Sequence, residues 1–169
     1  AFALPNGEIV IYSKMLRHIK TDDELSGLLS HEISHVTNRH SMRLLCKSLS
    51  GYLLLSVMMN DVNGLMTIIL DNAHNLQQLS FSRTYEEEAD ISGLKLLEKY
   101  KINPKGMIDL FEILQKEHSV NIPGFLSTHP VTSDRITYIK KHIKNHPFSF
   151  TPHPELMQLL TKAKTQMSN

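Results

Sequence analysis

Apolar and polar residues follow the spacing of helices along most of this chain, and the start of the chain is the exception. The first twelve residues are rich in β-prone side chains, and Asn6-Gly7 divides them into two short runs. Asn-Gly between such runs is the strongest short-range signal for a β-hairpin. We therefore expect an α+β fold, in which a small two-stranded sheet precedes a mostly helical domain.

The pattern next predicts a long helix. Thr21-Asp22-Asp23-Glu24 has the form of a capping box, in which the Thr21 hydroxyl accepts from the backbone of Glu24 and the Glu24 carboxylate reaches back. Apolar positions continue to about Cys46 and cover most of the circumference of this helix. A helix that is apolar on most sides is buried, so this one should be central.

Later segments are delimited by polar interruptions, caps and prolines. The apolar stretch over 53–70 is too interrupted for a membrane span, which needs roughly 20 apolar residues, and we interpret it as two helical pieces joined by a turn. A hairpin that touches a membrane is the alternative for this stretch. The other predicted segments are a helix over 83–100, a helix from about 104 to 117, a loop over 121–128, a helix from Thr132 or Ser133 to about Lys144, and a short amphipathic helix after the prolines of 147–154.

Composition is that of an ordinary globular domain. A chain of 169 residues with 41% hydrophobic and 21% charged residues can form about one domain with its own core. The net charge of +1 argues against nucleic acid or an anionic membrane as the main partner. The single cysteine, Cys46, excludes an internal disulfide and is expected to be a buried core thiol. Because the chain starts without an initiator methionine or a signal segment, we expect it to be part of a longer parent.

His31-Glu32-Ile33-Ser34-His35 follows the pattern H-E-x-x-H on the predicted central helix. Residues four apart share a helix face, so both imidazoles can reach one metal ion while Glu32 is held beside them to act on water. This short pattern also occurs by chance, and the alternative is a pair of core histidines with a surface glutamate. The apolar surroundings favour a site, because buried titratable groups need partners.

A catalytic zinc site needs a third protein ligand. The metzincin continuation requires Gly and His where the chain has Asn38 and Ser41, so that subclass is excluded. Glu86 and Asp90 lie four residues apart in the densest acidic cluster, so one could bind the metal while the other supports a ligand histidine. Taken alone, a solvated acidic face paired with Arg83 explains this cluster better, since charge runs usually face water.

Taken together, the two motifs resemble those of a known family. They are similar, in order and spacing, to those of the gluzincin zinc metalloendopeptidases that include HtpX-like, BepA-like and type I CAAX prenyl proteases. The resemblance covers roughly residues 1–140. The segments that carry it are residues 1–7, His31-Glu32-x-x-His35, Val36-Thr37-x-Arg39-His40, Ser82-Arg83-x-x-Glu86-x-Glu88-Ala89-Asp90, and Ser127-Thr128-His129-Pro130 with Arg135.

The resemblance implies a zincin-like domain, mostly helical, with a small sheet beside the H-E-x-x-H helix and one bound Zn²⁺. It implies His31, His35 and Glu86 as zinc ligands and Glu32 as the catalytic base that takes a proton from the attacking water. It further implies that Asp90 supports a ligand histidine, and His31 is the expected one.

The resemblance also places His129 near the cleft, where it could donate to the developing oxyanion or occupy the open position of the metal. Arg135 is expected to anchor the loop that carries His129. His40 could contact the site, but a solvated helix end is the expectation. The remaining histidines have no ligand spacing and are expected at the surface or in loops: His18, His74, His118, His142, His146 and His153.

These features predict a metalloendopeptidase that hydrolyses internal peptide bonds of proteins. Residues 1–146 would form the catalytic domain, and 147–169 a proline-punctuated linker and a short C-terminal helix. A substrate strand would pair with the free edge of the sheet formed by residues 1–12. The resemblance implies misfolded, membrane or envelope proteins as substrates. It also implies a location in the cell envelope or near a membrane, which is periplasmic in a bacterium.

Two other classes of function are open at this stage. A metal-binding interaction or chaperone-like domain without hydrolytic activity would result if His129 filled the open metal position. The presence of Glu32 argues against that class, because a structural site needs no base. A di-iron carboxylate bundle would need a second E-x-x-H pair besides Glu32-x-x-His35, and the sequence has none, so it is set aside.

Overall fold

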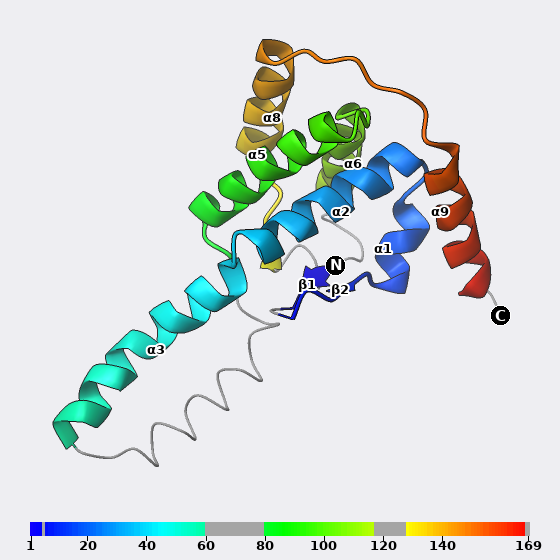
Figure 1. Ribbon diagram of the computed structural model, residues 1–169. Helices are drawn as coiled ribbons and strands as arrows, with labels where there is room; N and C mark the ends of the chain where they lie inside the picture. The colour runs from blue at the N-terminus through cyan, green and yellow to red at the C-terminus, as the bar shows by residue number, and fades with distance from the viewer. Residues whose placement is uncertain (5, 60–79, 117–127, 168–169) are drawn as a thin grey trace.

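The computed structural model describes the chain except for residues 5, 60–79, 117–127 and 168–169. One helix, α2, runs through the middle of the fold, and the hairpin and the other helices of the body lie around it (Figure 1). The described elements are β1 (Phe2–Ala3), β2 (Ile9–Val10), α1 (Ser13–His18), α2 (Asp22–Thr37), α3 (His40–Met59), α5 (Arg83–Lys99), α6 (Lys105–Lys116), α8 (Ser133–Asn145) and α9 (Pro154–Gln166). The predicted α+β, mostly helical class is confirmed.

The hairpin forms as the Asn-Gly signal predicts. β1 and β2 pair antiparallel, with Phe2 opposite Val10. Gly7 adopts φ 93°, a left-handed conformation that a glycine reaches without a steric penalty. The side-chain oxygen of Asn6 accepts from the backbone N–H of Glu8 at 3.1 Å and closes the turn. Because β1 contacts α2, this turn sets the sheet against the central helix.

The cap of α2 agrees with the capping box, but its end does not agree with the predicted length. Thr21 Oγ1 accepts from Glu24 N at 3.2 Å, while the Glu24 carboxylate accepts from the backbone of Lys20 at 2.6 Å. The helix ends at Thr37, and Arg39 turns the backbone with φ 54° before α3 begins. The prediction of one helix to about Cys46 is therefore wrong, because apolar spacing continues in α3 and conceals the break.

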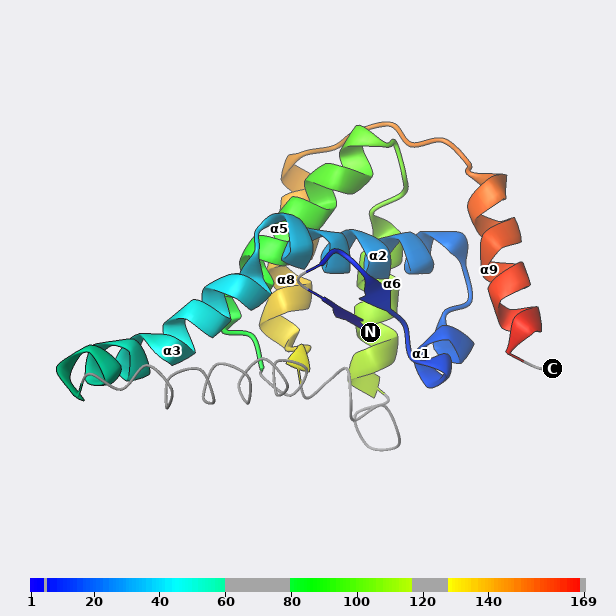
Figure 2. The same ribbon diagram turned by 60° about the horizontal axis from the view of Figure 1, so that its bottom comes forward.

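α3 runs outward from the body of the protein (Figure 2). Cys46 lies on α3 and is exposed, so the predicted core thiol is a second error with the same origin. If α2 continued without a break, Cys46 would lie on the same face as the buried residues of α2. Because the chain turns before α3, this face of α3 does not meet the core. No helix within the described ranges combines the length and the hydropathy that crossing a bilayer requires. Most of the stretch over 53–70 and of the loop over 121–128 lies outside the described residues.

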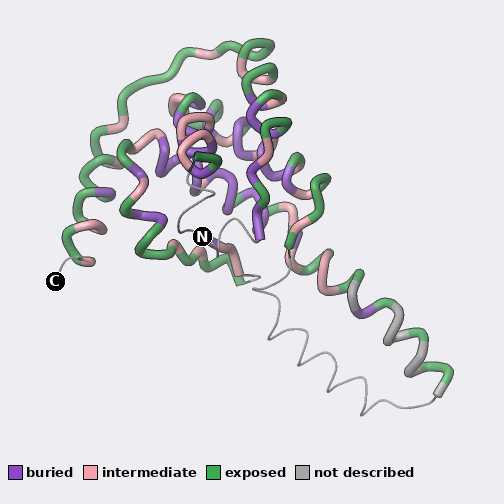
Figure 3. The backbone as a smooth tube through the Cα atoms, turned by 180° about the vertical axis from the view of Figure 1, so that it is seen from behind, coloured by how far each residue is buried: buried purple, intermediate pink, exposed green. Residues whose placement is uncertain are grey.

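The core lies where α2, α5 and α6 meet, and buried residues concentrate there (Figure 3). Its largest fully buried side chains include Leu28, Leu97, Met107 and Phe111. The predicted helices over 83–100, 104–117 and 132–144 are confirmed within one or two residues at each end, and Thr132 caps α8. The division of the chain near residue 146 stays a prediction.

Gly27 lies at a close approach of α2 and α6. A Cβ atom at this position would lie 2.7 Å from Cα and 2.8 Å from the backbone nitrogen of Met107. Alanine favours a helix over glycine by about 1 kcal/mol, but the neighbouring backbone cannot move without separating the two helices. The steric clash with Met107 therefore outweighs the gain in helix propensity, and an alanine at position 27 destabilises the fold.

We expect Gly27→Ala to lower the free energy of unfolding by about 1–3 kcal/mol, as overpacking of a core does. Urea unfolding followed by circular dichroism measures this change. Lys95→Ala, at an exposed position of α5, is the control and should change stability by less than about 0.5 kcal/mol. A Gly27→Ala protein as stable as the parent would contradict the close contact of α2 with α6.

Candidate metal centre

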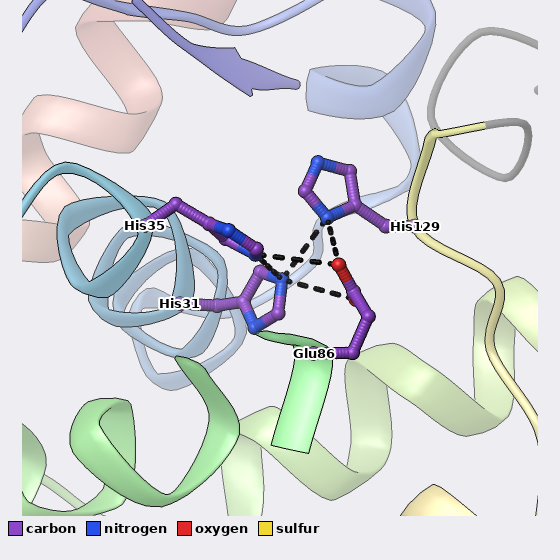
Figure 4. A group of neighbouring side chains, drawn as sticks. All are labelled: His31, His35, Glu86 and His129. Carbon is purple, nitrogen blue, oxygen red and sulfur yellow. Dashed lines mark hydrogen bonds and ion pairs between the residues drawn. The ribbon is translucent and has the colours of Figure 1, made fainter. Parts of the chain in front are cut away.

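Three segments that are far apart in sequence bring four polar side chains together in the interior (Figure 4). His31 and His35 come from α2, Glu86 from the first turn of α5, and His129 from the segment ahead of α8. All four are buried, and one ligand atom of each lies within 4.8 Å of those of the others. These are four of the residues that the sequence singled out.

The distances within this cluster fit a metal ion. Nε2 of His31 lies 3.1 Å from Nε2 of His35 and 3.3 Å from Nδ1 of His129. Oε1 of Glu86 lies 3.0 Å from Nδ1 of His129 and 3.4 Å from Nε2 of His35. Four donors held tetrahedrally at about 2.0–2.1 Å from a Zn²⁺ ion would lie about 3.3–3.4 Å from one another. Both the chemistry of the donors and their spacing therefore suit such an ion.

The electrostatics of the cluster also suit metal binding. Burial lowers the pKa of His35 to about 3, although the neighbouring carboxylate of Glu86 acts the other way. Burial alone would raise the pKa of Glu86, but the hydrogen bond from His129 and the nearby imidazoles of His35 and His31 outweigh it and hold this pKa far below its usual range. At neutral pH His35 is neutral and Glu86 is charged, which are the forms that bind a metal.

Asp90 holds His31 from the side away from the cluster. Oδ1 of Asp90 lies 2.8 Å from Nδ1 of His31. A carboxylate only accepts, so Nδ1 carries the proton and the lone pair of Nε2 faces Glu86 and the other imidazoles. Burial opposes a charge on His31, but the hydrogen bond and the charge of Asp90 outweigh it and raise the pKa of this histidine. The expected support of His31 by Asp90 corresponds to this contact.

Arg135 connects Asp90, Glu86 and the segment that carries His129. It donates from Nε to Oδ2 of Asp90 at 2.9 Å and from Nη2 to Oδ1 at 2.7 Å. Its Nη1 lies 2.6 Å from Oε2 of Glu86 and donates to the carbonyl of Pro130 at 2.9 Å. Tyr138 adds a hydroxyl donor to Oδ2 of Asp90. The loop-anchoring role expected of Arg135 corresponds to its bond to Pro130.

Glu32 lies beside the cluster in an unusual state for a buried acid. It is fully buried, and neither of its carboxylate oxygens has a hydrogen-bond partner among the described residues. Oε1 of Glu32 lies 3.9 Å from Nε2 of His129. A buried carboxylate that accepts no hydrogen bond is costly, so its place next to four side chains that could hold a metal ion marks Glu32 as a candidate for a chemical role.

His40 is where the structure corrects the sequence interpretation of this region. It was expected at a solvated helix end, but it is fully buried, and its Nδ1 lies 2.9 Å from Nδ1 of His35. Phe81 was also missed, and its ring stacks on His35 with centroids 4.2 Å apart. His40 reaches the cluster because the helix breaks after Thr37, which the apolar spacing does not reveal. No motif in the sequence indicates that Phe81 contacts the cluster. Of the other histidines, His18, His142, His146 and His153 are half-buried or exposed as expected, and His74 and His118 lie outside the described residues.

A cavity of about 310 Å³ adjoins the cluster on the side of Glu86. Phe81, Pro130 and Tyr138 line it together with Thr132 and the charged residues Arg83, Glu86, Glu87, Asp134 and Arg135. Glu86 and Arg135 form an ion pair with each other. The greater part of the exposed wall is apolar, and the size is one that ligand pockets commonly have.

Comparison with known proteins identifies the class to which this fold and this cluster belong. The family described as peptidase family M48 matches residues 1–143, and the chain belongs to this family. The family resemblance predicted from the motifs is thereby confirmed.

Individual relatives are metalloproteases and proteases by name. The chain is 30% identical over 168 residues to the beta-barrel assembly-enhancing protease of Yersinia pestis, covering 91% of this chain and 33% of that protein. It is 35% identical over 135 residues to mitochondrial metalloendopeptidase OMA1 of Arabidopsis thaliana, covering 77% of this chain and 26% of that protein. For OMA1 of Saccharomyces cerevisiae the identity is 33% over 150 residues, with 83% and 42% covered. The chain thus spans less than half of the length of each of these relatives.

We expect Arg135→Met to lower the free energy of unfolding of the metal-free protein by about 3–5 kcal/mol, because it leaves the buried charge of Asp90 without its cation. Urea unfolding in the presence of a chelator measures this loss. Lys140→Met makes the same replacement in the exposed Lys140–Glu112 pair and should cost less than about 1 kcal/mol. Equal losses in the two variants would contradict the central place of the Asp90–Arg135 pair.

Proposed function

We propose that this chain is the catalytic part of a zinc metalloendopeptidase that hydrolyses internal peptide bonds of proteins. The observation that carries the proposal is a buried set of two imidazoles and a carboxylate at metal-ligand spacing, next to a buried glutamate whose oxygens accept no hydrogen bond from the described residues. Membership of peptidase family M48 supports the same conclusion. The non-hydrolytic alternative is not favoured, since Glu32 is retained and the relatives named above are proteases.

In this proposal His31, His35 and Glu86 hold the ion. A bound zinc ion supplies Lewis-acid polarisation of the substrate carbonyl and lowers the pKa of water toward about 7. Glu32 takes the proton of the attacking water and passes it to the leaving amine. Its unengaged carboxylate oxygens support that role. Asp90 keeps the proton of His31 on Nδ1, and Arg135 keeps Asp90 charged.

His129 has a special position in the proposal. Catalytic zinc sites keep three protein ligands and reserve the fourth position for water or substrate. Nδ1 of His129 lies 3.3 Å from Nε2 of His31 and 3.0 Å from Oε1 of Glu86, which supports a fourth-ligand role in this conformation. We infer that hydrolysis requires His129 to leave this position. Its imidazole can then donate a hydrogen bond to the developing oxyanion.

We further propose that the substrate binds as an added strand at the edge of the β1–β2 sheet, which contacts the metal-bearing helix α2. The apolar cavity beside Glu86 is suited to a side chain next to the scissile bond. The names of the relatives point to β-barrel assembly and to mitochondria. By extension, quality control of membrane or envelope proteins is the proposed role, with a location near a membrane.

Metal content tests the ligand assignment. We expect one zinc per chain by elemental analysis of the purified protein. His31→Ala and Glu86→Gln should bind zinc much more weakly than the parent, because each removes one of the three ligands held on α2 and α5 and leaves His129, which hydrolysis displaces, to complete the set. His129→Ala should retain one zinc, because three protein ligands suffice in catalytic sites. Undiminished zinc in Glu86→Gln would remove Glu86 from the ligand set.

Glu32→Gln tests the base. We expect it to retain zinc and to lower kcat/KM for unfolded casein by about 10²–10⁴-fold, the usual contribution of general acid–base catalysis. Lys95→Gln, on the exposed face of α5, is the control and should cleave casein at the parent rate. Normal turnover by Glu32→Gln would refute the assignment of Glu32 as the base.

A further inference from the structure

We propose that His40 and Glu88 form a positioning pair for His35, which sets its ring orientation and its tautomer so that Nε2 is available to the metal. The inference rests on the proposed function, in which His35 is a zinc ligand. His40 itself touches neither the metal position nor the substrate, and it acts through His35.

The contacts of His40 leave its ring little freedom. It is fully buried, with Nδ1 lying 2.9 Å from Nδ1 of His35 and Nε2 lying 3.2 Å from Oε2 of Glu88. Its ring is nearly parallel to that of Tyr85, with an angle of 5° and centroids 4.7 Å apart. Arg43 covers the same tyrosine ring at 4.6 Å and donates to Oε2 of Glu88 at 2.9 Å. The imidazole is therefore held on its face by a stack and at both nitrogens by neighbours.

The proton positions follow from what each partner can accept. The carboxylate of Glu88 carries no proton, so a lone pair of His40 Nε2 at 3.2 Å would be repelled, and a proton there is attracted even though the contact is not well aligned as a hydrogen bond. Nδ1 of His40 is then the acceptor, and Nδ1 of His35 must donate. A proton on Nδ1 of His35 leaves the lone pair on Nε2, the atom that lies beside Glu86.

A local backbone feature makes this contact possible. On a continuous helix, residues five apart point about 140° away from each other, so His40 could not reach His35. The break between α2 and α3, with φ 54° at Arg39, turns His40 back toward the metal cluster. This conformation is unfavourable for a residue with a side chain, and Asn38 secures the break by donating to Ser92 on α5 at 3.1 Å. Such strain persists where the surrounding structure demands it, often at functional sites.

The two ligand histidines of α2 are thus held in equivalent ways by different groups. His31 donates from Nδ1 to Asp90, a buried carboxylate. His35 donates from Nδ1 to His40, and the carboxylate of Glu88 stands one residue further out, 40% exposed. Both arrangements direct Nε2 of the ligand histidine toward the proposed metal position. The arrangement around His35 also connects the metal cluster to the first turn of α3.

The zinc dissociation constant tests this proposal without relying on activity. His40→Phe keeps a ring against Tyr85 but removes both nitrogens, and we expect it to weaken zinc binding about 10–100-fold, as loss of such supporting groups does. His40→Asn restores an acceptor for His35 and should recover most of that loss. Competition with a chromophoric chelator measures both values, and urea unfolding of the metal-free variants checks that each one folds.

A second pair of variants leaves the buried ring in place. Glu88→Gln removes the carboxylate that orients His40, whereas Glu87→Gln makes the same charge change at the adjacent, exposed position. We expect Glu88→Gln to weaken zinc binding more than Glu87→Gln does, and less than His40→Phe does. Equal dissociation constants for the two glutamine variants would remove Glu88 from the pair.

The outcomes separate this inference from the proposed function. Parent protein that binds no zinc would overturn both. Parent protein that binds zinc and cleaves casein, together with a His40→Phe variant of unchanged zinc affinity, would overturn only the role of His40. Weak zinc binding by His40→Asn as well as His40→Phe would also contradict the proposal, because restoring an acceptor for Nδ1 of His35 would then not restore metal binding.

Discussion

The interior of this protein depends on the hydrogen bonds and the ion pair of one buried carboxylate, that of Asp90. It is fully buried on α5 and receives hydrogen bonds from His31 of α2 and from Arg135 and Tyr138 of α8. Burial alone would raise the pKa of Asp90, but the charge of Arg135 and the bond from His31 outweigh it and keep the pKa low. Three helices therefore meet around one negative charge, and a shift of α8 would leave that buried charge without its cation.

The same charge organises the candidate metal centre. Arg135 contacts both Asp90 and Glu86 and donates to the carbonyl of Pro130, next to His129. It therefore links α5 to the segment that carries His129. The polar interior is thus one connected network rather than a set of separate ion pairs. Such networks are most stable when their members are satisfied, and Glu32 stands out among the described residues because both of its carboxylate oxygens lack a hydrogen-bond partner.

The fold separates a compact body from a projecting helix. Apolar packing of α2 against α5 and α6 makes the body rigid, and the metal cluster lies at the edge of this packing. α3 leaves the body directly after the H-E-x-x-H helix, and its first residue, His40, contacts His35. The orientation of α3 and the orientation of a candidate metal ligand are consequently connected through one buried imidazole.

The sequence by itself determined the hairpin, the caps, the helices over 83–100 and 132–144, and the pairing of His31 with His35, because each depends on local chemistry or on the spacing of motifs. His31 and His35 share a helix face by periodicity alone. The meeting of Glu86 and His129 with that face was expected only from family resemblance, since no local rule brings distant segments together. Only the tertiary structure decided that α2 ends at Thr37, that His40 is buried and that Cys46 is exposed. The physical reason is that apolar spacing reports which residues avoid water, whereas a backbone break at a non-glycine residue is stabilised by contacts from other helices.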